Sequence, residues 1–527
     1  MDDRADVIVV GSGPNGLAAA CALARSGWDV TVLERAGEPG GAVRCGELTL
    51  PGYVHDLYSS FYGLLHASPA FGEFELGRRV EWAHFETPVA AAVEPGVAAL
   101  CHADLEWTVD HLNSLRPGDG DAWRDLYSWW QRIGRRFLDA MLAPVGAPLP
   151  ALKLLAAARI RGTLDLATAL LEPPETLTRR LFTSPEARAL FASGASHTDL
   201  AIDVPGGSAF VLLLAMLAQE RNMPVAVGGA RRITAALVDA LAEAGGQVLT
   251  GHEVRRIAVE RGRAAGVETS EGGVFHARRA VVADVGPPQL VELVGEARLP
   301  ARYLDGIRRW RYGTGMFRAD LALDGPVPWK APGLGACGVV HVTGDLETMA
   351  RTGYEVRRGL LPVHPMLVVG QHTVADPSRA PKGRHTLWIE TMVPGTPRAD
   401  AAGSVPCASW AAAAGGFFER SMALLERHAP GLGSRVLAHR IRTPADLHEE
   451  NPNLVDGDPG GGSSAIDQQF VLRPVPGWFR YATPVRGLYL CSASTHPGGG
   501  VHGMCGWNAA RRVLRDATLL GRLLPLP

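Results

Sequence analysis

The chain has few cysteines, and no two of them stand close together along the sequence. The seven cysteines among its 527 residues are Cys21, Cys45, Cys101, Cys337, Cys407, Cys491 and Cys505. This scatter excludes the disulfide framework of a small secreted protein. It also lacks the C-x-x-C spacing of a structural zinc site, so we expect no metal.

Long apolar runs and an excess of charge of one sign are also absent. The longest apolar run, residues 209–218, predicts a buried helix, since a membrane-spanning helix needs roughly 18 residues. The net charge of −2 gives no reason to expect a nucleic-acid partner. The acidic N-terminal residues lead directly into the first predicted strand, so we expect no signal peptide and a cytoplasmic location.

What the sequence does contain is a nucleotide-binding pattern near its N-terminus. Residues 6–10 are apolar and β-branched, as in a buried strand, and residues 17–25 are rich in alanine and leucine, as in a helix. Between them, Gly11 permits a tight turn, Gly13 lets a pyrophosphate approach the backbone, and Gly16 lets the helix pack on the strand. The N–H groups of the helix N-terminus would point at that phosphate.

The residues that follow favour FAD over NAD. A second predicted strand, residues 29–33, ends in Glu34, where a carboxylate can accept hydrogen bonds from the adenosine ribose. Gly40, Gly41 and Arg44 come next, a pattern typical of FAD-binding proteins of the glutathione-reductase-like class. The arginine suits a diphosphate because its guanidinium can bind two oxygens at once.

Two other classes of dinucleotide enzyme are excluded. Residues 333–338 also match G-x-G-x-x-G, but they follow no predicted strand and lead into a strand rather than a helix, so we expect no NAD(P)H site. A flavin-dependent disulfide reductase needs two neighbouring cysteines, and Cys45 stands alone where such a pair would fall.

The C-terminal region repeats the order of strand, glycine-rich turn and helix. Residues 487–491 predict a buried strand, residues 492–503 contain the turn His496-Pro-Gly-Gly-Gly500, and a helix is expected from about residue 506 to 520. Backbone N–H groups at such a helix N-terminus can stabilise the negative charge that develops on a flavin when it is reduced.

These two segments resemble the phytoene desaturase (carotenoid desaturase and isomerase-like) family of FAD-dependent oxidoreductases. The resemblance covers both ends of the chain and residues 224–285, and it implies FAD as the only redox cofactor. It also implies that the residues binding the adenosine, the diphosphate and the flavin ring are Gly11, Gly13, Pro14, Asn15, Gly16, Glu34, Arg35, Gly41, Arg44, Val254, Ser494, Gly499, Gly500, Val501 and His502.

The predicted fold class is α/β, with a Rossmann-like FAD-binding domain of the glutathione-reductase/amine-oxidase type and an inserted α+β substrate domain. We expect the FAD-binding domain to be discontinuous, formed by residues 1–75, 224–300 and 470–527. Residues 76–223 and 301–469 would form the substrate domain, with a helical cap at about 119–223. Residues 457–464 predict a flexible glycine loop.

The predicted cap is basic and rich in tryptophan, and two interpretations stay open. It could rest on a membrane surface and admit a lipophilic substrate, or it could be a helical lid with a solvated face. The residues concerned are Trp107, Trp123, Trp129, Trp130, Arg132, Arg135, Arg136, Lys153, Arg159 and Arg161.

The family resemblance implies transfer of a hydride from a substrate carbon to flavin N5 and loss of a neighbouring proton, which leaves a C=C or C=N bond in a lipophilic small molecule. Oxygen or a quinone would reoxidise the flavin. His502 is the candidate proton acceptor, with His496 second, because a neutral imidazole is a suitable base near pH 7. His496 could equally cap the glycine turn.

Three alternatives stay open at this stage. The first is a flavin-dependent isomerase of the same family, and the second is an amine oxidase, for which Trp478, Phe479 and Tyr481 could supply aromatic rings. The third is a non-catalytic binding protein of related fold, as in prenyl-protein escort factors. The sequence does not decide the substrate or the oligomeric state.

Overall fold

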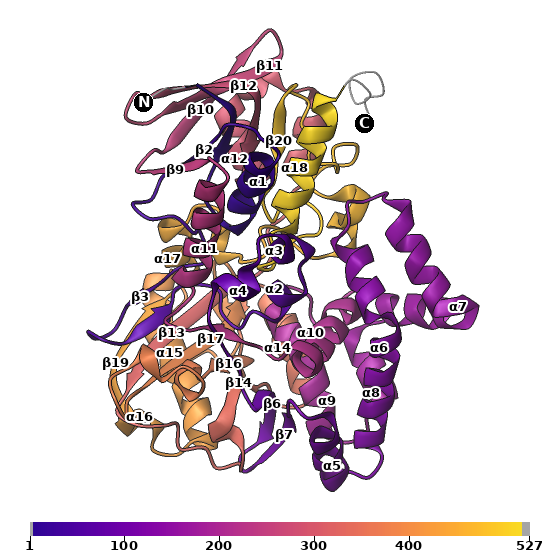
Figure 1. Cartoon of the computed structure of the whole chain (residues 1–527). Helices are drawn as coiled ribbons and strands as arrows, with labels where there is room; N and C mark the ends of the chain where they lie inside the picture. Colours follow the sequence, from indigo (N-terminus) through magenta and orange to yellow (C-terminus); the bar gives the residue numbers. More distant parts are fainter. Residues whose placement is uncertain (1–3, 519–527) are drawn as a thin grey trace.

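The computed structural model describes residues 4–518, except for the side chains of residues 160 and 161. Residues 519–527 of the predicted FAD-binding domain and the Arg161 side chain of the predicted cap lie outside the described residues. Two large sheets, one above the other in Figure 1, organise the chain, and helices cover both.

The first sheet is built on parallel strands from both ends and the middle of the chain. Its strands read as continuous apolar runs because both faces are covered. Along the path of hydrogen-bonded neighbours they are β10 (Val254–Glu260), β11 (Arg263–Thr269), β12 (Val274–Ala283), β1 (Arg4–Val10), β2 (Val30–Glu34) and β9 (Gln247–Thr250), and β20 (Leu488–Leu490) also pairs with β12.

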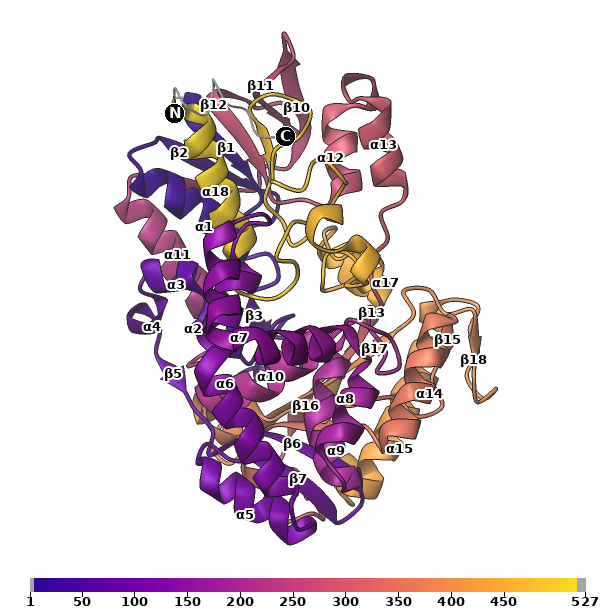
Figure 2. The same cartoon turned by 90° about the vertical axis from the view of Figure 1, so that its right-hand side faces the viewer.

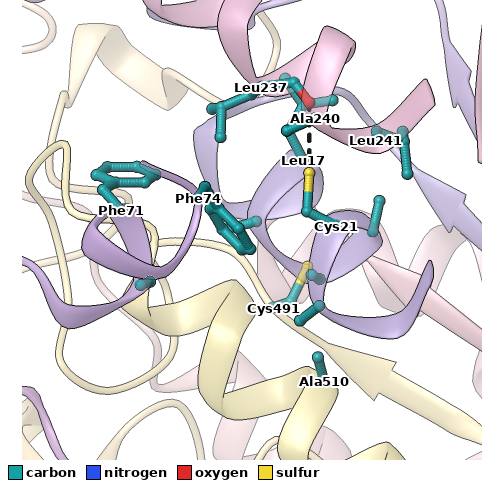
Figure 3. Packing of buried hydrophobic residues seen from close by; sticks show 14 of the residues in the cluster. Leu17, Cys21, Phe71, Phe74, Leu237, Ala240, Leu241, Cys491 and Ala510 are labelled. Atoms are coloured by element: carbon teal, nitrogen blue, oxygen red, sulfur yellow. Dashed lines mark hydrogen bonds between the residues drawn. The ribbon is translucent and has the colours of Figure 1, made fainter. Parts of the chain in front are cut away.

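Alternate side chains of β1 enter two different cores, as the pleat of a strand requires. Val7 and Val9 pack with α1 (Pro14–Arg25), α11 (Arg231–Glu243) and α18 (Met504–Ala517). Figure 3 shows this packing, in which Cys21 Sγ on α1 donates to the Leu237 carbonyl of α11 at 3.3 Å. Ile8 and Val10 face the opposite core, formed with α12 (Pro287–Val294) and α13 (Ala301–Arg308), which Figure 2 shows on the other side of the sheet.

The second sheet is largely antiparallel and follows the first in space. Its strand order is β19 (Val436–Arg442), β13 (Gly315–Leu323), β17 (His385–Val393), β16 (Leu367–Gly370), β14 (Cys337–Val342), β6 (Thr87–Glu94) and β7 (Val97–Cys101). Three two-stranded sheets complete the strands: β3 (Cys45–Glu47) with β4 (Val54–Asp56), β5 (Trp82–Ala83) with β8 (Val225–Ala226), and β15 (Leu360–Leu361) with β18 (Ala399–Asp400).

Helices cover both faces of the second sheet. One face packs on the helical segment α5 (Leu105–Leu115), α6 (Asp119–Leu142), α7 (Pro148–Leu171), α8 (Pro174–Leu181), α9 (Pro185–Ala192) and α10 (Ser208–Arg221). The other face packs on α15 (Trp410–His428) and α16 (Leu432–Arg435). The remaining α-helices are α2 (Gly63–Ala67), α3 (Pro69–Glu73), α4 (Leu76–Arg79), α14 (Leu346–Arg357) and α17 (Pro444–Glu450).

The tryptophans of the predicted cap divide between core and surface. Trp123 and Trp130 are buried, and their indole N–H groups donate to Gln219 and Glu220 on α10. Trp107 is exposed. Within residues 4–518, no helix is both long enough and apolar enough to cross a membrane.

Buried ion pairs join the two sheets through the segment after β4. Asp56 is fully buried, and its carboxylate contacts Arg379 Nη1 at 2.8 Å and accepts from Ala230 N–H, at the start of α11, at 2.8 Å. Arg318 on β13 donates to the Tyr58 carbonyl at 2.6 Å and to the carbonyl of Asp56. This segment therefore contacts both halves of the molecule.

Asp56→Asn is expected to destabilise the fold because it leaves the Arg379 guanidinium buried beside a neutral side chain. Breaking a buried ion pair in this way typically costs about 3–5 kcal/mol. Thermal denaturation followed by circular dichroism should show a clearly lower midpoint. Asp239→Asn, on the exposed face of α11, is the control and should leave the midpoint unchanged; equal midpoints for both variants would contradict this account.

Candidate functional site

The glycine turn after β1 has no room for side chains. A Cβ atom on Gly16 would lie 2.2 Å from the Gly11 carbonyl oxygen, and one on Gly13 would lie 2.7 Å from Asp284 Oδ2. Gly11 has a φ of +93°, which a residue with a side chain rarely adopts. The close packing leaves the N–H groups at the start of α1 directed at the space beyond the turn.

Glu34 fixes this turn from the end of β2. Its Oε2 atom accepts from Ser12 N–H at 3.0 Å and from Ser12 Oγ–H at 2.6 Å, while Oε1 accepts from Ala36 N–H at 2.9 Å. The carboxylate is thus held by its own hydrogen bonds, and it still borders the cavity described below.

The segment around Gly41 packs directly on the turn. A Cβ atom on Gly41 would lie 2.9 Å from Gly13 Cα, and Gly40 N–H donates to the Ser12 carbonyl at 3.1 Å. Arg44 donates from Nε to the Gly41 carbonyl at 3.0 Å and from Nη2 to Tyr58 Oη at 3.1 Å. The guanidinium is therefore oriented beside the N-terminus of α1.

Asp284, at the end of β12, is a site residue that the sequence pattern did not identify. Its Oδ2 atom accepts from Gly16 N–H at 2.9 Å, and burial raises its pKa to about 7. The one local signal was its position, as the first polar residue after a buried parallel strand, where ligand sites of α/β sheets occur.

The C-terminal glycine turn forms another wall of the same cavity. Ser494, Gly499, Gly500, Val501 and His502 all border it, and α18 begins immediately after them. The Nδ1 atom of His502 accepts from Met504 N–H at 3.0 Å, so the ring caps the helix. Burial lowers the pKa of His502 to about 4.

His496 occupies a different environment from His502. It is absent from the cavity wall, and its buried Nδ1 atom has no hydrogen-bond partner among the described residues. Its carbonyl accepts from Tyr481 Oη at 2.9 Å, and burial lowers the pKa of its imidazole to about 4. This geometry favours a structural role for His496, in line with the cap considered from sequence.

The glycine loop expected to be flexible is held by buried charged groups. Asp458 accepts from the N–H groups of Gly313, Gly460 and Gly462 at 2.7 to 2.8 Å. Arg473 donates to the carbonyls of Ser463 at 3.0 Å and Ala493 at 2.8 Å. Since Gly460 also packs on Gly499, the loop supports the C-terminal turn.

One cavity of about 950 Å³ connects these walls. Its polar part lies between Glu34, Arg35, Val254 and the start of α1. Its other part is mostly apolar, with side chains from α2, α10, β13 and β17. Pockets for cofactors and drug-sized ligands usually have about 300–1,000 Å³, and the glycine cradle with Glu34 and Arg44 fits an adenine dinucleotide.

The comparison with known families decides the identity of this site. Residues 15–398 match the family described as flavin containing amine oxidoreductase. The chain belongs to this family. Its cofactor is FAD and it is an FAD-dependent oxidoreductase, as the sequence predicts.

Relatives within this flavoprotein family align over nearly the whole chain. One of the two named chains of the limonene dehydrogenase of Castellaniella defragrans is 28% identical, over 98% of this chain and 95% of the relative. Phytoene desaturase (neurosporene-forming) of Cereibacter sphaeroides is 26% identical, over 96% of this chain and 93% of the relative. The predicted resemblance to phytoene desaturase-like FAD oxidoreductases is therefore confirmed.

Solved structures of flavoproteins share the fold. A redesigned variant of putrescine oxidase superposes with a TM-score of 0.61 at 16% identity, covering 98% of this chain and 99% of the other. At this identity the likeness concerns the fold alone, and it confirms the predicted α/β class with a Rossmann-like FAD-binding domain.

Most of the predicted cofactor residues border this cavity, although their individual contacts with FAD stay predictions. Gly16 and His496 do not border it, since Gly16 packs behind the turn against Gly11. The residues that the structure brings together are Gly11, Gly13, Pro14, Asn15, Glu34, Arg35, Gly41, Arg44, Val254, Ser494, Gly499, Gly500, Val501 and His502.

Gly41→Ala is expected to weaken FAD binding because the new methyl group would press on Gly13 Cα and shift the turn. We expect the dissociation constant to rise at least about tenfold, equivalent to ~1.4 kcal/mol. Flavin fluorescence during titration of the apoprotein measures it. Gly37→Ala, where a Cβ atom meets nothing within 4 Å, is the matched control. Wild-type affinity in Gly41→Ala would refute the proposed contact.

Proposed function

We propose that this flavoprotein dehydrogenates a lipophilic small molecule and forms a C=C bond, with C=N formation as the second possibility. One observation carries the proposal: the apolar part of the cavity is continuous with the part walled by the glycine turns. A substrate in the apolar part would therefore meet a cofactor held in the polar part without contact with bulk water.

The character of the apolar part supports a lipophilic substrate. Leu64, Leu213, Leu214, Met223 and Met316 border it. Methionine side chains adapt to substrates of irregular shape because they are unbranched and polarisable. The names of the two relatives, limonene dehydrogenase and phytoene desaturase, refer to reactions of hydrocarbons.

We propose that the cofactor lies along the cavity with its adenosine at Glu34, Arg35 and Val254 and its diphosphate between the start of α1 and Arg44. The flavin ring would then lie at residues 498–502. FAD, when bound, supplies a two-electron acceptor for a hydride. The protein orients the substrate C–H bond and excludes water.

Reoxidation by oxygen or a quinone fits the second G-x-G-x-x-G match. Residues 333–338 fold as a short 3₁₀ helix that leads into β14, so they lack the strand–turn–helix geometry of a dinucleotide site. We therefore propose an electron acceptor other than NAD(P)⁺.

The reaction class can be tested by anaerobic reduction of the bound flavin. We expect limonene or phytoene to bleach the visible flavin band of the purified holoprotein and putrescine to leave it unchanged. Admission of oxygen or a soluble quinone should restore the band, whereas NAD⁺ should not. Bleaching by putrescine alone would favour an amine oxidase, and product formation beyond one flavin equivalent under argon would favour an isomerase.

We further propose that the helical segment contacts a membrane through α7, which lies at the right-hand edge of the molecule in Figure 1. Its exposed leucines include Leu149, Leu152 and Leu155, and Lys153 and Arg159 are exposed beside them. Met141 and Leu142, just before α7, border the apolar part of the cavity. This continuity favours a lipid surface as the source of an apolar substrate.

The double substitution L152E/L155E is expected to abolish flotation of the protein with vesicles of phosphatidylcholine and phosphatidylglycerol, because it places two charges at the lipid contact. The visible spectrum of its FAD should not change. Leu437→Glu, which alters an equally exposed leucine on β19, should float like the wild type. Failure of the wild type to float would exclude this contact.

A further inference from the structure

A single carboxylate interrupts the apolar part of the cavity. On β17, alternate residues Trp388, Glu390 and Met392 share one face of the strand, and all three border the cavity. Met316 lies opposite Met392 on β13, and it borders the cavity too. Glu390 thus stands in a row of large apolar side chains.

This carboxylate has no charged partner of its own. Among residues 4–518 no ion pair reaches Glu390, although Arg318 lies directly opposite it on β13. The Arg318 guanidinium is fully buried and already donates to the Tyr58 carbonyl and to Asp320 at 3.0 Å. An unpaired carboxylate in such surroundings costs free energy, which indicates that its presence serves a purpose other than stability.

Burial raises the pKa of Glu390 to about 7. The groups around it act in both directions: Arg318, Arg442 and the Trp388 indole favour the carboxylate, and Asp320 disfavours it. The residue opposite it on β16 is the uncharged Val368. A base is most effective when its pKa is close to the working pH.

The wall next to Glu390 is continuous with the cofactor side of the cavity. Arg318 binds the Tyr58 carbonyl, the neighbouring Ser59 donates from Oγ to the Ala42 carbonyl at 2.8 Å, and Ala42 follows Gly41. Ser59 and Ala42 border the same cavity. A substrate in this part therefore has Glu390 on one side and the cofactor wall on another.

We propose that Glu390 is the proton acceptor of the dehydrogenation, a role that rests on the proposed function. One substrate C–H bond breaks with transfer of its hydrogen and both electrons to the flavin, which is the oxidant. The C–H bond on the neighbouring carbon breaks with transfer of a proton to the Glu390 carboxylate. Its electron pair becomes the new π bond.

Other groups on the cavity wall are less suited to this role. The acceptor lone pair on Nδ1 of His502 already binds Met504 N–H, so its neutral ring carries the proton on Nε2. His197 Nε2 lies 2.9 Å from His341 Nε2, and burial lowers its pKa to about 4. Glu450 already accepts from Tyr58 and Arg442.

The first test needs no substrate. Dicyclohexylcarbodiimide, an apolar reagent, modifies protonated carboxylic acids, and peptide mass spectrometry locates the adduct on the holoprotein. We expect Glu390 to be labelled at pH 6 and labelling to fall toward pH 9 as the carboxyl ionises. Glu450, on the same wall, should stay unlabelled. Absence of labelling, or labelling independent of pH, would overturn the proposal.

The second test compares Glu390→Gln with the exposed variant Glu419→Gln by anaerobic stopped flow, with limonene or phytoene as the reductant. In the wild type the rate of flavin reduction should rise with pH through about 7, since only the carboxylate accepts a proton. Glu390→Gln should slow reduction by about 100-fold or more and lose this pH dependence, with FAD retention unchanged. Glu419→Gln should behave as wild type.

The outcomes separate the two proposals. Wild-type rates in Glu390→Gln would overturn the role of Glu390 and leave the dehydrogenase function standing. If neither hydrocarbon reduces the wild-type flavin, the proposed function fails and the proton-acceptor role fails with it, whatever the carbodiimide labels.

Discussion

The buried carboxylate of Asp56 determines how the two sheets of this flavoprotein face each other. It contacts Arg379, from the connection between β16 and β17 of the second sheet, and Ala230 N–H at the start of α11, both at 2.8 Å. Burial of an ion is tolerable only when partners surround it, so the segment that follows β4 has one allowed position. That segment, residues 57–62, forms the wall between the cofactor side and the apolar side of the cavity.

The same physical device recurs wherever the site needs a defined backbone. Asp284 accepts from Gly16, and Asp458 accepts from Gly313, Gly460 and Gly462. Glycine gives the backbone its close approach but adds conformational freedom. Buried carboxylates remove that freedom by accepting the N–H groups, so the turns can be glycine-rich and still rigid enough to position a cofactor.

Glu390 differs from these carboxylates because, within the described part of the chain, it forms no ion pair and accepts no backbone N–H group. Asp320, only a strand away, is fully buried between Arg318 and Arg442, and these two arginines lower its pKa although burial opposes them. Burial of Glu390 raises its pKa instead. Two neighbouring carboxyl groups thus take opposite protonation preferences, a pattern typical of a structural acid beside a reactive one.

The sequence by itself determined the cofactor end, because residues 6–44 form a strand, turn, helix and strand whose glycines and Glu34 act through local geometry. It also predicted the C-terminal glycine turn and most strands of both sheets. It did not identify Asp284 or Glu390, and it described a rigid loop as flexible. Asp458 holds that loop together with Gly313, a residue 145 positions away in the sequence. Whether a buried carboxylate is paired depends on such distant partners, so only the tertiary structure decided which acids are structural and which one faces the substrate.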